Sequence, residues 1–362
     1  MLEKIKRHAQ HIFRTLEQPT WRFGVQPPVV DVPVGSQQPF FKEFQQGIVV
    51  CDLHTFAKKY PKKIKLLSGS TKWQQHKYAA LVEGFWNNSL VLFVAKNIQQ
   101  QVPIELHALL THIESDYLIE KVVVIVEDGA HVVVHDMIAY MHDMVFRTVD
   151  VFVQSHAQCT FVYEQNVSLH TSFFAYLNVY ADAYACVDVQ ALMTGGGKSK
   201  WWPTFIAHGE HAVIKIGGAY SARKNQQCDI VSLQQHDAAH SVSHLALNGV
   251  IADNAHAVYE GMVHIALSAP GVDASQQNKN MVLHKTAKVQ SIPSLEALNN
   301  EVQCAHGSAI GHFDNEQLFY LMARGLPKQV AQQLVLNSFL QRALQDCNVL
   351  RKKIPLLTQN FF

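Results

Sequence analysis

A cysteine and a histidine stand two residues apart in the segment Glu301–Gly307. If this segment is a strand, Val302, Cys304 and His306 share one face, because side chains alternate along a strand. Thiolate and imidazole bind zinc, iron and iron–sulfur clusters, but two donors do not complete a tetrahedral site. The segment therefore indicates one of two things. It is half of a metal or cluster site that residues from elsewhere complete, or it is a buried cysteine beside a surface histidine.

The composition sets limits on the class of protein. The chain has 362 residues, 48% of them hydrophobic, and a formal net charge of +1. This balance argues against a broad nucleic-acid-binding surface, and the longest apolar runs are far too short to cross a membrane. The six cysteines form no C-x-x-C pair, and Met1 to Leu16 lacks the apolar core of a signal peptide. We therefore expect reduced thiols in a cytoplasmic protein.

Residues 89–312 have the alternating pattern of strands and carry a weak internal repeat. A polar or small residue, then alanine, then an alternating run recurs with alanine spacings of 27, 26, 29, 26, 17 and 32 residues. Such a period predicts a β-solenoid, in which small residues fit the corners, in preference to a β-sandwich. The repeated alanines are Ala130, Ala157, Ala183, Ala212, Ala238, Ala255 and Ala287.

Helical regions flank this core on both sides. We expect residues 1–88 to hold a helix up to about residue 18, an irregular Pro-rich segment, a short helix capped by Asp52 and a helix over 73–85. Residues 313–362 predict a helix capped by Asp314, a break before residue 328 and a second helix to about residue 345. The second helix has a wide apolar sector, which suits packing within the chain or against a partner.

Two other motifs suggest ligands but are explained better without them. Gly195–Ser199 resembles the end of a phosphate-binding loop, but Leu192 stands where the first glycine is needed, so we expect a glycine turn. His236, His240 and His244 have the spacing of helical metal ligands. Their segment alternates like a strand, which predicts a row of surface histidines rather than a zinc site. No pattern of nucleophile and base or of paired carboxylates indicates a catalytic centre.

The chain resembles the SufB/SufD family of iron–sulfur cluster assembly proteins over roughly residues 45–345. The resemblance is carried by Asn278–Leu283, Cys304–Gly307, Leu318–Tyr320 and Arg324–Pro327. The chain resembles the SufD branch more than the SufB branch, because SufB-type sequences have a cysteine where this chain has Asn278 and an acidic residue where it has Gly307. Ala305, Ser308 and Ala309 are small departures from the SufD-like pattern.

The resemblance implies a mainly β protein, a right-handed parallel β-helix flanked by N-terminal and C-terminal α-helical domains. It also implies a non-catalytic scaffold subunit that pairs with a SufB-type paralogue and docks SufC-type ABC ATPases. Because paralogous interfaces often tolerate self-pairing, we also expect a homodimer when the chain is isolated. A transient iron–sulfur cluster would be shared with the paralogue at His306 and Cys304. The resemblance also permits a reduced flavin, which the sequence itself does not indicate. The implied ATPase-docking residues are Phe319, Arg324, Gly325, Leu334, Val335 and Phe339.

Two alternatives differ in class. A solenoid enzyme of the carbohydrate-active type needs Asp, Arg or Lys clustered on one solenoid face and is usually secreted. The sequence shows no such cluster and no signal peptide. A binding or structural β-helix with no cluster role differs from the scaffold in one respect, because only the scaffold needs His306 for cluster delivery.

Overall fold

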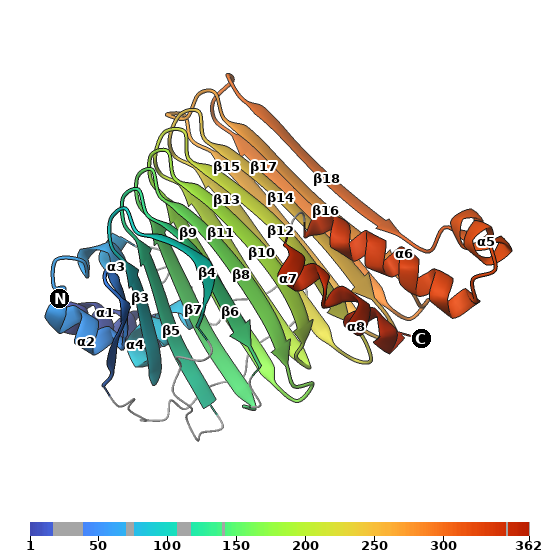
Figure 1. Ribbon diagram of the computed structural model, residues 1–362, viewed down its shortest axis with the longest axis horizontal. Coiled ribbons are helices and arrows are strands. Elements are labelled where there is room, and N and C mark those ends of the chain that lie inside the picture. The colour runs from blue at the N-terminus through green and yellow to red at the C-terminus, as the bar shows by residue number, and fades with distance from the viewer. Residues whose placement is uncertain (17–38, 70–75, 107–116, 140–141, 345–346, 362) are drawn as a thin grey trace.

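The computed structural model describes residues 1–16, 39–69, 76–106, 117–139, 142–344 and 347–361. Its core is two long sheets, and from β3 onward the chain passes from one sheet to the other at each successive strand (Figure 1). Each strand pairs in parallel with the strand two positions earlier, so Cys186 of one coil lies beside Gln158 of the coil before it. The predicted parallel β-solenoid is therefore confirmed, and the chain is mainly β. Only the pairings of β1 with β2 and of β2 with β3 are antiparallel among the described strands.

The strands fall into the two sheets as follows. The first sheet comprises β1 (Phe41–Gln45), β2 (Ile48–Cys51), β3 (Asn88–Val94), β5 (Tyr117–Val126), β7 (Met144–Val153), β9 (Ser172–Ala181), β11 (Lys198–Ala207), β13 (Gln227–His236), β15 (His256–Ile265) and β17 (Lys288–Ala297). The second comprises β4 (Gln99–Glu105), β6 (His131–Ile138), β8 (Gln158–Val167), β10 (Cys186–Gly195), β12 (Val213–Ala222), β14 (Val242–Ile251), β16 (Asp273–Val282) and β18 (Gln303–Gly311).

The corners explain the repeat and correct its register. The residue before each strand of the second sheet is small and buried in four successive coils, and serine follows in the next coil. These residues are Ala130, Ala157, Ala185, Ala212 and Ser241. The prediction was wrong in placing Ala183 and Ala238 in this series. It also included Ala255 and Ala287, which precede strands of the first sheet and belong to the opposite corner. Two corner series had been merged into one.

The described helices of the N-terminal region pack at the N-terminal end of the solenoid (Figure 1). They are α1 (Leu2–Thr15), α2 (Leu53–Lys59), α3 (Lys65–Gly69) and α4 (Lys77–Phe85). Asp52 caps α2 as expected, because its carboxylate accepts a hydrogen bond from the Thr55 amide at 2.9 Å. Helix α4 covers the outer face of β5 and β7, where Lys121 is buried between Glu83 and Asp150 at 2.7 and 2.5 Å. The irregular segment expected at 19–39 lies almost entirely outside the described residues.

The interior of the solenoid changes character along its axis. The early coils are filled mostly by Val, Ile, Leu and Phe, around a charged cluster in which Arg147 contacts Glu120 and Asp136. From β13 onward polar side chains take inward positions. They are Ser232, Gln234, His236, Ser243, Gln276, Asn278 and Asn280, all buried. The C-terminal coils therefore bury less apolar surface than the N-terminal ones, and they depend more on hydrogen bonds.

The C-terminal helices lie on the outer face of the second sheet, except that α5 projects beyond the strand ends (Figure 1). Their bounds are α5 (Asn315–Ala323), α6 (Lys328–Ala343), α7 (Asn348–Arg351) and α8 (Ile354–Thr358), followed by a 3-10 turn (Gln359–Phe361). Asp314 caps α5 as predicted. Helix α6 approaches β12 so closely that a Cβ atom at Gly217 would lie 2.4 Å from the Ala343 carbonyl oxygen. The Asn248 amide of β14 donates to the Phe339 carbonyl at 2.6 Å, which fixes the end of α6.

The two other motifs have structural roles. Gly195 and Gly196 turn the chain from β10 into β11 with φ of +78° and +74°, which explains the glycines without phosphate. His236 is buried between the hydroxyls of Ser241 and Ser243, at 2.7 Å from each, and burial lowers its pKa to about 4. The expected row of surface histidines is therefore wrong at His236, which faces the interior.

Candidate functional site

Cys304 and His306 lie on β18, the last strand of the second sheet. β18 pairs with β16 on one side only, so its other edge leaves backbone groups unpaired within the sheet. Cys304 is half-buried and packs, with Val302, against the apolar interior of the coil before it. His306 is exposed. Alternation places both side chains toward the solenoid interior, and His306 is open because no further coil follows β18 in its sheet.

The residue paired with His306 in β16 is Gln276, whose side chain is buried. Neither its amide nitrogen nor its amide oxygen has a hydrogen-bond partner among the described residues. Buried amides are normally hydrogen-bonded, so this pair of atoms is suited to a water molecule or to a group that enters from the open end. Sequence reasoning missed Gln276, because its inward direction follows from the register of β16 with β18.

Asn278, which the resemblance matches to a cysteine of SufB-type sequences, is a structural residue here. Its amide donates to the Tyr220 hydroxyl at 3.2 Å, and its carbonyl accepts from Asn280 at 2.6 Å and Ser291 at 2.8 Å. Its partner in β18 is Ser308, four residues beyond Cys304. Four residues along a strand span about 13 Å, so Asn278 and Cys304 do not share a local site.

A cavity of about 260 Å³ lies beside His306. It is formed by residues of three neighbouring strands, β14, β16 and β18. Its polar members include His244 and Ser275, whose side chains hydrogen-bond at 2.8 Å. By alternation, Ser275 and Ala305 point to the outer face of the sheet, opposite to Cys304. The cavity therefore lies on the outer face of the sheet, while the exposed His306 side chain is directed to the inner side of the same terminal strand.

The last coil also exposes apolar side chains. Ile292 and Leu295 of β17, Leu298 after it, and Ile310 of β18 are all more than a third exposed, Ile310 at 51%. Grouped apolar side chains next to free strand edges are typical of a surface that another protein covers. Cys304 and His306 thus belong to a surface that looks incomplete in a single chain.

The predicted ATPase-docking residues divide into two groups. Phe319, Arg324, Gly325 and Leu334 are exposed on α5, on the α5–α6 turn and on α6, with Phe319 at 73%. Tyr320, Met322 and Val330 are exposed on the same two helices but were not among the predicted residues, because the helical period alone does not say which face packs on the solenoid. Arg324 lies over the Tyr320 ring at 5.2 Å.

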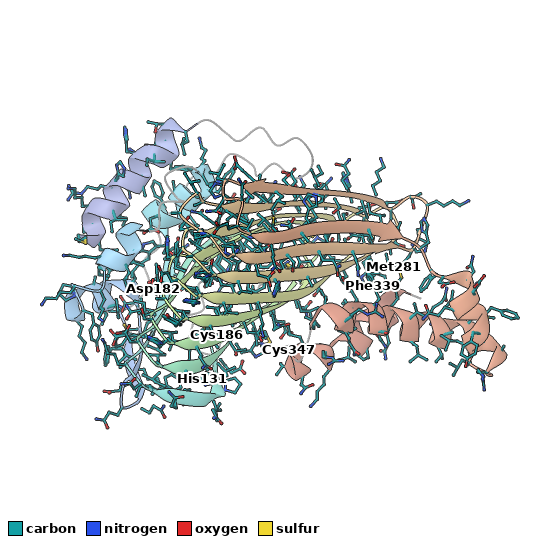
Figure 2. All side chains as sticks on the ribbon, turned by 90° about the horizontal axis from the view of Figure 1, so that it is seen from above. His131, Asp182, Cys186, Met281, Phe339 and Cys347 are labelled. Atoms are coloured by element: carbon teal, nitrogen blue, oxygen red, sulfur yellow. The ribbon has the colours of Figure 1, made fainter. Side chains whose placement is uncertain are left out.

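Val335 and Phe339 instead serve packing within the chain. Val335 is buried with Leu318 and Ala331 between α5 and α6. Phe339 packs against the apolar junction of α6 with the second sheet, where Met281 also lies (Figure 2). These two residues hold α6 in place, and the exposed group presents the outer surface.

The tail has a further anchor that the sequence did not reveal. The Lys353 ammonium contacts both carboxylate oxygens of Glu164 on β8, at 2.6 and 2.5 Å. The same carboxylate accepts from His135 Nε2 at 3.1 Å, and His135 Nδ1 lies 2.9 Å from Glu105. The hydrogen bond to Glu164 and the contact with Glu105 outweigh burial and raise the pKa of His135. This cluster ties α8 to the solenoid.

The described part of the chain contains no group of three or more His, Cys, Asp or Glu side chains able to hold a metal ion. Across the same residues, no helix is both long enough and apolar enough to span a bilayer. Any metal centre at Cys304 and His306 would therefore need donors from outside the described residues.

Comparison with known proteins identifies the family. The model of the SUF system FeS cluster assembly SufBD core domain matches residues 109–339. The iron–sulfur cluster assembly protein SufD of Escherichia coli K12 is 29% identical over 203 residues, which is 55% of this chain and 47% of that protein. SufD of Bacillus subtilis is 25% identical over 316 residues, which is 83% of this chain and 70% of that protein. A SufBD family protein of Staphylococcus aureus USA300 is 22% identical over 279 residues, covering 74% and 58%.

The matched regions span about half to two thirds of the lengths of these relatives, between 47% and 70%. The family match includes the solenoid from before β5 to the last coil, as well as α5 and most of α6. It therefore contains both Cys304 and His306 and the exposed residues of the two helices. The chain belongs to the SufB/SufD family of iron–sulfur cluster assembly proteins and is most like SufD.

Proposed function

We propose that this chain is a non-catalytic scaffold subunit for the assembly and transfer of iron–sulfur clusters, in a complex with a SufB-type paralogue and SufC-type ATPases. The observation that carries the proposal is the exposed His306 on an unpaired terminal strand, with a half-buried thiol two residues before it. One imidazole and one thiol supply too few donors for a cluster. The paralogue supplies the remaining donors when it covers the edge of β18.

Such a shared site suits a cluster that is cargo. Neutral imidazole is a weaker cluster ligand than thiolate, so a cluster held partly by His306 is released more readily than one held by four cysteines. The free edges of β17 and β18 and the apolar side chains Ile292 and Ile310 supply the pairing surface. In the absence of the paralogue, a second copy of this chain covers the same surface and forms a homodimer.

The ATPase acts through α5 and α6. Phe319 and Leu334 form the centre of the docking surface, because both are exposed and apolar. Helix α6 contacts β12 and β14, and β14 pairs with β16, the neighbour of β18. A displacement of α6 on ATP binding is therefore transmitted through this sheet to the strand that carries His306. The ATPase supplies the energy, and this chain hydrolyses nothing.

The first experiment tests the complex. The chain is co-expressed with a SufB-type paralogue and a SufC-type ATPase, and the purified complexes are weighed by light scattering. We expect Phe319→Ala with Leu334→Ala to lose the ATPase and keep the paralogue. The control Val349→Ala removes an exposed apolar side chain from α7 and keeps both partners. If the unaltered chain binds neither partner, the proposal fails.

The second experiment tests the cluster role. His306→Ala is expected to assemble the complex normally and to impair delivery of clusters to an apo-ferredoxin. Ser308→Ala, an exposed change two residues along the same strand, is the matched control and keeps full delivery. Full delivery by the His306→Ala complex would favour a β-helix that assembles with its partners without handling a cluster.

A further inference from the structure

The opposite end of the molecule has a charge that the whole-chain balance conceals. Residues 1–88 contain 13 Lys and Arg against 6 Asp and Glu, a formal charge of +7. Residues 89–362 contain 17 against 23, a formal charge of −6. Segregation on this scale attracts anionic partners to one end of a chain whose net charge is close to zero.

Part of this charge surrounds an apolar pocket. A cavity of about 270 Å³ lies between the start of α1 and the segment from α2 to α3. Its apolar lining comes from Met1, Leu2, Ala57, Pro61 and Ile64. A volume of this size accommodates one large aliphatic or aromatic side chain with room to spare.

Lysines gather around the pocket. Lys58 lines it, Lys62 follows the lining residue Pro61, and Lys6 lies 4.1 Å over the Trp86 ring, which contacts the lining residue His54. Lys58 and Lys62 are exposed, and no described acidic side chain forms an ion pair with either. Burial lowers the pKa of His54, and the nearby charges of Lys6 and Lys58 add to that effect.

Acidic groups near the rim are few. Glu3 lines the pocket, 4.0 Å from His54 Nδ1. The Asp52 carboxylate is occupied by the backbone amides of Phe40 and Thr55, both at 2.9 Å. The lysines therefore keep a surplus of positive charge beside an apolar depression.

We propose that this pocket, lined by α1 and α2, docks an acidic segment of another protein that inserts one apolar side chain. The recess receives the apolar group and the lysines pair with flanking carboxylates, which together give affinity and orientation. A bilayer is a poorer fit, because the apolar residues line a hollow and do not project as an inserting surface would. This docking site is independent of the cluster-bearing edge at the other end of the solenoid.

The test measures fluorescence anisotropy of a labelled oligoglutamate peptide with one central leucine, added to the full-length chain. We expect binding that weakens as salt is raised, and about tenfold weaker binding when serine replaces the leucine. Lys58→Glu with Lys62→Glu is expected to weaken binding at least about tenfold. The matched reversal Lys198→Glu with Lys285→Glu, made at exposed lysines of the solenoid, changes binding less than about twofold.

A variant whose pocket is filled by a larger side chain separates the contribution of the pocket to binding from the contribution of charge. Ala57→Leu is expected to weaken binding of the leucine peptide and to leave binding of the serine peptide unchanged. Thermal melting confirms that each variant is folded. Equal binding of the two peptides by the unaltered chain overturns the proposal. So does preferential binding of phosphatidylglycerol vesicles or of single-stranded DNA, since either result assigns the basic end to a different class of partner.

Discussion

The anchor of the tail on the solenoid gives a prediction with a calculable size. Lys353→Ala removes the ammonium that contacts Glu164 and leaves that carboxylate, 8% exposed, with one fewer partner. Breaking a fully buried pair costs about 3–5 kcal/mol, and an exposed pair contributes about 0.2–1 kcal/mol. Lys353 is 36% exposed and His135 still contacts Glu164, so we expect an intermediate loss of about 1–2 kcal/mol.

This loss acts on local opening of α7 and α8. Hydrogen exchange measures such opening directly, and about 1.4 kcal/mol corresponds to a tenfold change in the opening constant. We expect the amides of residues 350–357 to exchange about five- to thirtyfold faster in Lys353→Ala, while those of β8 remain protected. Lys352→Ala, at the exposed neighbour, is the matched control and exchanges as the unaltered chain does. Equal exchange in both variants would refute the view that Glu164 holds the tail.

The same cluster makes stability depend on pH. Folding raises the pKa of His135 above its usual 6.5. The contribution of His135 to folding stability is therefore complete below pH 6.5 and is lost as the pH rises through the pKa of the folded state. Burial alone would raise the pKa of Glu164, but its bonds with His135 and Lys353 lower it below 4.5, so its contribution is lost as pH falls through the folded value. We expect this cluster to stabilise most between about pH 4.5 and 6.5. In melting curves, His135→Gln removes the decline on the alkaline side, and an unchanged decline would contradict this assignment.

Three further results follow from particular contacts. Gly217→Val is expected to push α6 away from the sheet and to lower the free energy of unfolding in urea by about 1–3 kcal/mol. Gly307→Ala, where an added Cβ meets nothing within 4 Å, is the neutral control. Equal effects of the two changes would show that α6 does not need its close approach to β12. Arg147→Met leaves two carboxylates buried inside the solenoid, so we expect a loss of about 3–5 kcal/mol, and an unchanged melting temperature would contradict the ion-pair geometry. Iodoacetamide is expected to modify the exposed Cys186 and to spare Cys159, which is buried and has its pKa raised to about 12. Mass spectrometry that finds Cys159 modified in the folded chain would count against this packing.

The solenoid was predictable from the sequence because its signals are local. Period-two alternation marks the strands, small residues mark the corners, and Asp52 and Asp314 mark helix starts. The exact corner series was not predictable, since alanines occupy the first corner up to Ala212 and the opposite corner from Ala255, and only strand pairing separates the two. Tertiary register, which a single sequence does not display, decided that point.

The candidate site was predicted only in part. Cys304 and His306 were placed correctly on one strand, because their spacing and the following glycine are visible in the sequence. Gln276 and the anchor between Lys353 and Glu164 were missed, since the latter pair is separated by 189 residues. The burial of Val335 was also hidden, because the pattern of α6 is apolar over too wide a sector to distinguish its two sides.

The change of the solenoid interior from aliphatic to polar has a consequence for how the protein folds during its synthesis. The apolar coils next to α4 leave the ribosome before the polar ones, so a stable template already exists when β16 to β18 are synthesised. Each new coil then needs to find only its predecessor, because contacts in a solenoid are between neighbours. The last coil joins with the least apolar burial, and without a partner we expect it to be the first to fray and the first that a protease reaches. We therefore expect an unassembled subunit to be degraded faster than one whose last coil a partner covers.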